Sequence, residues 1–265
     1  MLKDKKNEVW NIVEIARNKE RPNVRFYIEN IFDDFIEFHG DRNFRDDKAV
    51  IGGIASIDKI SVTVIGVNKG KNVKENVDTN FGMVHPEGYR KALRLMKQAE
   101  KFNRPIICFV DTPGAYCGVG AEERGQGQAI AQNLMEMSRL KTPIISIITG
   151  EGGSGGALGL SVSDKVYMLK NSIYSILSPE GFAAILWKDG NRASEAAKVM
   201  KITANDLKEL GVIEQVIEEP EPASIDNILD ISEQMKEMIL GFIEKYDKMT
   251  SEELVEQRYQ RFRKF

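Results

Sequence analysis

Residues 142–156 read TPIISIITGEGGSGG, and this stretch decides the fold class. Residues 144–149 are apolar or β-branched apart from Ser146, which is typical of a strand buried on both faces. Five of the next seven residues are glycine, and the sequence ALGLS then predicts a short helix from Ala157. A buried strand, a tight turn and a helix make one unit of a parallel α/β sheet.

Two more strand–turn–helix units flank this stretch. Residues 105–111, PIICFVD, lead through a glycine-rich loop at 112–125 to a helix predicted to end near Leu140. Residues 164–178 contain two short apolar runs and lead through Pro179 to the helical sequence FAAILW. We therefore expect an α/β fold with parallel strands whose two faces are covered by helices.

The N-terminal part of the chain precedes these units. Apolar residues at helical spacing predict helices over residues 7–38. Residues 49–57 and 60–67 are β-branched and flank Asp58 and Lys59, which predicts a hairpin. Residues 69–82 are interpreted as a charged loop, and Pro86 begins a helix that runs to about Lys101.

The C-terminal part is predicted to be mainly helical. Short helices are expected over residues 193–199 and 204–210, with Gly211 as a C-cap, before a strand within residues 212–217. A long apolar stripe from Ala223 onward packs on this core or on another subunit. Thr250 and Glu253 match a capping box and begin a last helix. We divide the chain into an N-terminal helical segment (1–48), a core (49–220) and C-terminal helices (221–265).

Composition excludes several classes of protein. The 265 residues include 37 Lys and Arg and 40 Asp and Glu, and this balance does not support a nucleic-acid coat or a membrane-surface protein. Two cysteines, Cys108 and Cys117, exclude a disulfide framework and a four-cysteine zinc module in this chain. The longest apolar run is too short to span a membrane, and residues 1–6 do not begin a signal peptide. We expect a cytoplasmic protein.

The glycine-rich residues 150–156 point to a site for negative charge. Glycine lets the backbone approach a ligand closely, and the first amides of a helix have no partner within it. Together they can form an oxyanion hole, although a tight turn needed for packing is an alternative. The stretch also matches a dinucleotide fingerprint, but Lys170 and Asn171 stand where the acidic residue is needed. It also matches a nucleophile elbow at Ser154, but no histidine follows it.

Residues 111–126, DTPGAYCGVGAEERGQ, form a second glycine-rich segment at a strand end. The carboxyl ends of parallel strands meet at one edge, so we expect both segments to line one cleft. Glu122 and Glu123 are adjacent and do not face each other, so they are interpreted as helix-dipole partners. His85 is interpreted as a loop residue rather than a base. The chain has only two histidines, the commonest general bases, whereas its glycine-rich segments offer many backbone N–H donors.

Six segments together resemble the alpha subunits of the bacterial acetyl-coenzyme A carboxylase carboxyltransferase. These segments are residues 40–55, 80–102, 111–126, 150–160, 178–188 and 258–265. The last of them, RYQRFRKF, is interpreted as a basic helix end rather than an RNA contact. The sequence differs from the family pattern at Cys117 and Phe182, and it lacks the N-terminal extension of the longer members.

The resemblance implies a crotonase-type fold of repeated β-β-α units. It implies transfer of a carboxyl group from carboxybiotin, held on the biotin carboxyl carrier protein, to acetyl-CoA. The product would be malonyl-CoA, in the first committed step of fatty acid biosynthesis. The expected partners are a beta subunit, in an alpha2-beta2 assembly, and biotin carboxylase. Zinc is expected in the beta subunit and no metal in this chain.

The resemblance also implies roles for particular residues. The backbone amides of Gly155 and Gly156 are expected to polarise the biotin ureido oxygen, while the beta subunit holds the thioester enolate. Substrate binding is expected at Gly114, Ala115, Gly118, Gly120, Gly152 and Gly153. Two alternatives stay open: a CoA-binding hydratase or isomerase of the same fold, and a non-catalytic assembly subunit.

Overall fold

The computed structural model describes residues 8–265. The predictions made for residues 1–7, which are the start of the first helix and the absence of a signal peptide, lie outside the described residues. Within the described range one sheet contains eight strands, in the order β1-β2-β3-β4-β5-β6-β8, with β7 paired to β5. The strands are β1 (Asp34–Glu37), β2 (Val50–Ile57), β3 (Ile60–Val67), β4 (Ile106–Thr112), β5 (Ile144–Gly153), β6 (Lys165–Leu169), β7 (Ile173–Ser175) and β8 (Gln215–Ile217).

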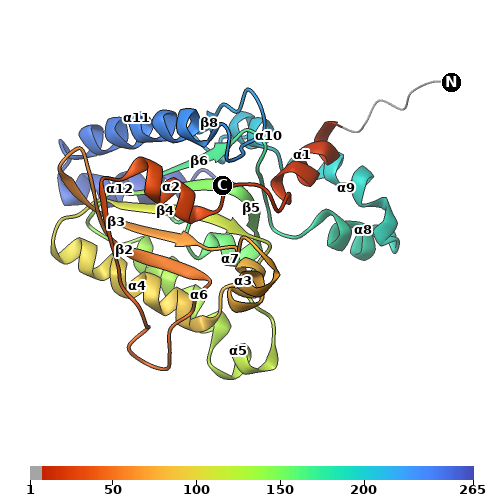
Figure 1. Ribbon diagram of the computed structural model, residues 1–265, viewed down its shortest axis with the longest axis horizontal. Coiled ribbons are helices and arrows are strands. Elements are labelled where there is room, and N and C mark those ends of the chain that lie inside the picture. Colours follow the sequence, from red (N-terminus) through yellow and green to blue (C-terminus); the bar gives the residue numbers. More distant parts are fainter. Residues whose placement is uncertain (1–7) are drawn as a thin grey trace.

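Helices cover both faces of this sheet, as Figure 1 shows. They are α1 (Glu8–Ala16), α2 (Val24–Ile31), α3 (Val73–Asp78), α4 (Pro86–Lys101), α5 (Val119–Glu123), α6 (Gln126–Met137), α7 (Ser154–Leu158), α8 (Pro179–Trp187), α9 (Ala193–Met200), α10 (Ala204–Glu209), α11 (Ile228–Tyr246) and α12 (Ser251–Phe262). Helices α4 and α6 pack on one face of the sheet, and α2 and α11 pack on the other. Each face has its own cluster of buried apolar residues. The long apolar stripe of α11 therefore packs in this core, not on another subunit.

The sheet combines an antiparallel and a parallel part. Strands β2 and β3 form the predicted hairpin, and the left-handed φ angles of Asp58 (49°) and Lys59 (69°) suit its two-residue turn. Strands β3, β4, β5, β6 and β8 are parallel to their neighbours, as the strand–turn–helix units predict. Their carboxyl ends share one edge of the sheet, where ligands of such sheets bind.

Two elements of the N-terminal third differ from the prediction. Residues 34–37 are strand β1, paired antiparallel with β2, not part of a helix. The apolar spacing suits a helix, but the backbone hydrogen bonds of the β2 edge need a partner strand. Residues 73–78 form the short helix α3 inside the predicted loop, capped by Asn72. None of its residues is buried, so no apolar periodicity marks it. We retain the division at residues 48 and 220 as a proposal.

Helix α12 begins at the predicted capping box, in which Thr250 and Glu253 bond reciprocally. Two arginines of the predicted basic helix end pair with carboxylates elsewhere in this chain. Arg258 is buried against Asp164, and Arg261 bonds to Glu214. These arginines fasten α12 to the sheet, and Arg263 and Lys264 stay exposed.

Candidate active site

A cavity of about 320 Å³ lies at the carboxyl ends of β4 and β5. Its lining comes from the loop after β4, from α5 and α6, and from the start of α7. The residues are Gly114, Ala115, Tyr116, Cys117, Glu122, Gln126, Gly127, Ile130, Ser154, Gly155 and Gly156. The two glycine-rich segments, which are about forty residues apart in the chain, therefore face one space, as their positions at neighbouring strand ends predict.

Helix α7 begins three residues earlier than predicted, so Gly155 and Gly156 belong to its first turn. Gly153 is the N-cap, and no side chain caps this helix. Amides of a first turn have no carbonyl partner within the helix, so they are free to meet a negatively charged atom. Ser154 adopts a left-handed φ of 53°, whereas Gly156 does not have a positive φ.

Glycine is needed where the loop after β4 touches the start of α7. A Cβ on Gly156 would lie 2.5 Å from the amide nitrogen of Ala115 and 2.6 Å from the carbonyl carbon of Gly114. A Cβ on Gly153 would lie 2.2 Å from the carbonyl oxygen of Pro113. Gly114 itself has a φ of 150°, which side-chain-bearing residues rarely adopt. These glycines set the width of the cavity by letting two backbones pack directly together.

The structure does not bring all the predicted substrate-binding residues to the cavity. Gly152 lies within β5 and pairs with Thr112 on one side and Tyr174 on the other. Gly118 and Gly120 lie at the start of α5 and are absent from the lining. Gly153, the N-cap of α7, is also absent from the lining. These positions were expected from the family resemblance, and α5 turns Glu122 rather than its glycines toward the cavity.

Gln126 is a site residue that the sequence analysis missed. Its Nε2 atom donates to the carbonyl oxygens of Val84, at 2.8 Å, and Tyr116, at 2.7 Å. The buried amide thus fixes the loop that carries Ala115 and Tyr116. A polar residue at the end of a glycine-rich loop was the available signal.

His85 lies behind the cavity wall and not in the lining. His85 is the N-cap of α4 and therefore stands at the end of a loop. Its ring stacks on that of Tyr116, with the ring centroids 4.2 Å apart. Its Nδ1 atom is 2.8 Å from the side-chain Nδ2 atom of Asn80. Burial lowers the pKa of the His85 imidazole, so the ring is neutral near pH 7 and supports the position of Tyr116.

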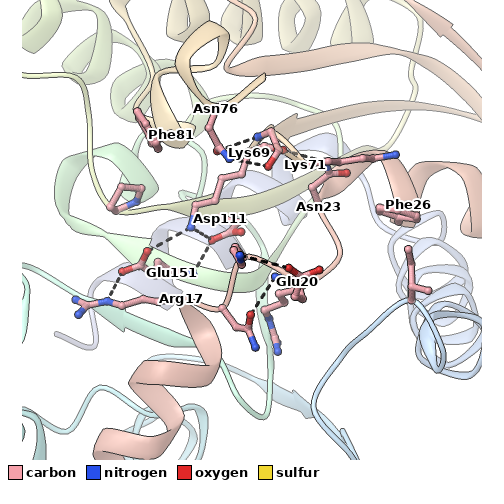
Figure 2. A pocket seen from close by; sticks show the side chains of 16 residues that line it. Arg17, Glu20, Asn23, Phe26, Lys69, Lys71, Asn76, Phe81, Asp111 and Glu151 are labelled. Atoms are coloured by element: carbon pink, nitrogen blue, oxygen red, sulfur yellow. Dashed lines mark hydrogen bonds and ion pairs between the residues drawn. The ribbon is translucent and has the colours of Figure 1, made fainter. Parts of the chain in front are cut away.

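Two further cavities adjoin the candidate site. One, of about 810 Å³, shares Ser154 and Gly155 with it and is lined mainly by apolar residues of β7, α9, α10 and the loops that follow these elements. The other, of about 480 Å³, lies beside Pro113 and contains the charged side chains of Arg17, Lys69, Asp111 and Glu151 (Figure 2). The spacing of these charged residues in the sequence did not predict that they meet.

Residues 8–265 contain neither a cluster of metal ligands nor a helix that could span a membrane. No group of three or more His, Cys, Asp or Glu side chains there is arranged to hold a metal ion. None of the helices described is both long enough and apolar enough to cross a membrane.

Comparison with solved structures confirms the predicted α/β fold of the crotonase type. Transcarboxylase 12S superposes with a TM-score of 0.71 at 20% identity, over 91% of this chain and 44% of that chain. The beta subunit of geranyl-CoA carboxylase from P. aeruginosa gives a TM-score of 0.65 at 15% identity, over 93% of this chain and 45% of that chain. This chain thus matches somewhat less than half of each of these larger proteins.

Sequence comparison reaches nearly the whole chain. The acetyl-coenzyme A carboxylase carboxyl transferase subunit alpha of Clostridium perfringens is 62% identical over 97% of this chain and 94% of its own length. The subunit of the same name from Streptococcus gordonii is 60% identical over 97% of this chain and 99% of its own length. The family model "Acetyl co-enzyme A carboxylase carboxyltransferase-like" matches residues 4–265. The chain therefore belongs to the acetyl-CoA carboxylase carboxyltransferase family.

Proposed function

We propose that this chain is a carboxyltransferase alpha subunit that transfers a carboxyl group from carboxybiotin to acetyl-CoA, forming malonyl-CoA. The observation that carries the proposal is the uncapped first turn of α7, which packs against the loop at Gly114 and Ala115 and lines the cavity together with it. Amide donors fixed before reaction stabilise charge that develops on an oxygen atom. Family membership supplies the reaction class.

The lining of the cavity fits the ring system of biotin. The amides of Gly155 and Gly156 would hold its ureido oxygen, because a urea oxygen needs donors and these donors have no helical partner. Carboxybiotin, when bound, would supply the carboxyl group and leave biotin behind. The adjoining apolar cavity, which shares Ser154 and Gly155, suits an apolar arm that leads to a carrier protein. Tyr89 donates from its hydroxyl to the Gly156 carbonyl at 3.1 Å, so α4 holds this turn in place.

The two alternatives are less well supported. A hydratase needs two carboxylates that share the cavity, but Glu122 is the single carboxylate among its lining residues in the described chain. Glu123 stands next to it and is not in the lining. A subunit used only for assembly has no need of two glycine-rich backbones that pack together at the strand ends.

The proposal includes partners. A beta subunit, in an alpha2-beta2 assembly, would hold acetyl-CoA and carry zinc, and the biotin carboxyl carrier protein and biotin carboxylase would supply carboxybiotin. The relatives named as alpha subunits support a beta partner. The cytoplasmic location stays a prediction.

The purified chain is expected to be inactive by itself, because its cavity supplies one set of backbone donors and the thioester needs another. Co-expression with a family beta subunit should restore activity. The assay is carboxylate transfer from malonyl-CoA to free biotin, which is the reverse reaction, with the beta subunit alone as control. Robust turnover by the chain free of any partner would contradict this assignment of roles.

Ser154→Ala is expected to keep substantial activity in the complex. Within residues 8–265 no side chain forms a hydrogen bond with the Ser154 hydroxyl, so no base is placed to activate it. The measurement compares turnover of the variant and of Ser154→Gly, which also removes the hydroxyl but suits the left-handed φ. Covalent labelling of Ser154 by a fluorophosphonate with loss of activity would instead support a hydrolase.

A further inference from the structure

The ladder between β4 and β5 is interrupted just before the candidate site. Val110 pairs with Ile148, and Thr112 pairs with Gly152. One residue of β4, Asp111, therefore lies opposite residues 149–151 of β5, which we call the β5 bulge. A bulge leaves backbone groups without their ladder partners and redirects the strand. Because α7 begins three residues after the bulge, the shape of the bulge determines where α7 points.

Two charged side chains bond to the backbone groups of the β5 bulge. The Oδ1 atom of Asp111 accepts a hydrogen bond from the amide of Glu151 at 2.8 Å. The Nε atom of Arg21 donates to the carbonyl oxygen of Thr149 at 2.6 Å. Charge-assisted hydrogen bonds of this kind are shorter and stronger than those between neutral groups. Side chains thus pair with one backbone donor of the β5 bulge, the Glu151 amide, and with one backbone acceptor, the Thr149 carbonyl.

Each of these side chains is held by an ion pair. Lys69 Nζ lies 2.7 Å from Asp111 Oδ1 and 3.3 Å from Glu151 Oε2, as the dashed lines in Figure 2 show. Burial alone would lower the pKa of the Lys69 ammonium, but the charges of Asp111 and Glu151 outweigh burial and raise it. The Nη1 atom of Arg21 lies 2.9 Å from Glu219 Oε1, and both side chains are almost fully buried.

Gly150 makes this arrangement possible. A Cβ at this position would lie 2.5 Å from Asp111 Oδ1, so any side chain would displace the carboxylate from the bulge. The first glycine of residues 150–156 therefore serves the bulge and not a ligand. The glycines at 155 and 156 remain the ones that face the cavity.

We propose that Asp111 and Arg21 are positioning residues that hold the β5 bulge and thereby aim the Gly155 and Gly156 amides at the cavity. Neither side chain is in the lining of that cavity, so both act through the backbone of β5. The inference rests on the proposed function of these amides. It adds residues of β4 and of the segment before α2 to those on which carboxyl transfer depends.

Two substitutions of Asp111 separate positioning from charge. Asp111→Ala removes the acceptor for the Glu151 amide, whereas Asp111→Asn keeps an oxygen acceptor and loses the charge that faces Lys69. In the complex with the beta subunit, Asp111→Ala should lower kcat about 10- to 100-fold, the cost of a misplaced reacting group. The KM for malonyl-CoA should change little, and Asp111→Asn should recover most of the turnover. Wild-type kcat in Asp111→Ala, or equal losses in both variants, would overturn the proposal.

A second measurement does not depend on activity. Amide hydrogen exchange of the full chain should become faster over residues 151–156 in Asp111→Ala and stay close to wild type in Asp111→Asn. The matched control is Glu214→Ala, since this carboxylate likewise accepts from a strand amide, that of Val166 at 2.8 Å, and pairs with Arg261 at 2.6 Å, but at the amino end of β6. This control should leave exchange over residues 151–156 unchanged.

The two measurements also separate this inference from the proposed function. A wild-type complex without carboxyl transfer would mean that the proposed function fails, and exchange would still decide whether Asp111 holds the bulge. Unchanged exchange over residues 151–156 in Asp111→Ala would overturn the inference even in a complex that is fully active.

Discussion

Gly156→Ala should lower the turnover of the assembled complex by about 100- to 1000-fold, the loss typical of one oxyanion donor. The added Cβ would lie 2.5 Å from the Ala115 amide nitrogen, closer than real contacts allow. Because the opposing atoms are backbone, the loop at Gly114 and Ala115 must move or α7 must turn. Either shift takes the first-turn amides out of position. The strain comes from this contact and not from φ, which is not positive at Gly156.

The measurement compares kcat and the KM for malonyl-CoA in complexes whose assembly is verified by size and whose helix content is verified by circular dichroism. We expect kcat to fall and KM to change little, because the thioester is assigned to the beta subunit. The control is Gly241→Ala on α11, where a Cβ would meet no atom within 4 Å. Near-normal turnover in an assembled Gly156→Ala complex would mean that this glycine only packs a turn.

Arg258→Ala should lower the free energy of unfolding by about 3–5 kcal/mol, the range for breaking a buried ion pair. The side chains of Arg258 and Asp164 are both 0% exposed, and two bonds of 2.8 Å join them. The guanidinium also donates to the carbonyl oxygens of Met137, Leu140 and Thr142. Its removal leaves a buried carboxylate and three backbone carbonyls without these partners, which is costly inside a protein.

Urea denaturation of the full chain measures this effect. The control is Arg263→Ala, which removes an exposed arginine from the same helix end and should change the free energy of unfolding by less than about 0.5 kcal/mol. Similar stability of the two variants would show that α12 does not depend on the buried pair. A large loss in Arg258→Ala alone would confirm that the terminal helix is fastened to the sheet through Asp164.

Local sequence patterns predicted the elements in which apolar and polar residues, or turn and capping residues, stand at clearly recognisable positions. The hairpin of β2 and β3, helix α4 and the capping box at Thr250 each depend on neighbours in the chain, so a few residues determine them. Strand β1 and helix α3 were missed for opposite reasons. The spacing of the apolar residues in β1 suits a helix, but pairing with the edge of β2 makes this segment a strand. Helix α3 has no buried residues, so it leaves no apolar periodicity in the sequence.

By itself the sequence determined the order of the strands and helices other than β1 and α3, and the two glycine-rich segments that meet at the cavity. Such features follow from backbone conformation and from the period of apolar residues, both of which are local properties. Only the tertiary structure decided that Gly156 touches Gly114, that Asp111 bonds to the β5 bulge and that Arg258 reaches Asp164. These contacts join residues 40 to 94 positions apart, and their existence depends on how the packed sheet brings distant backbones and charges together.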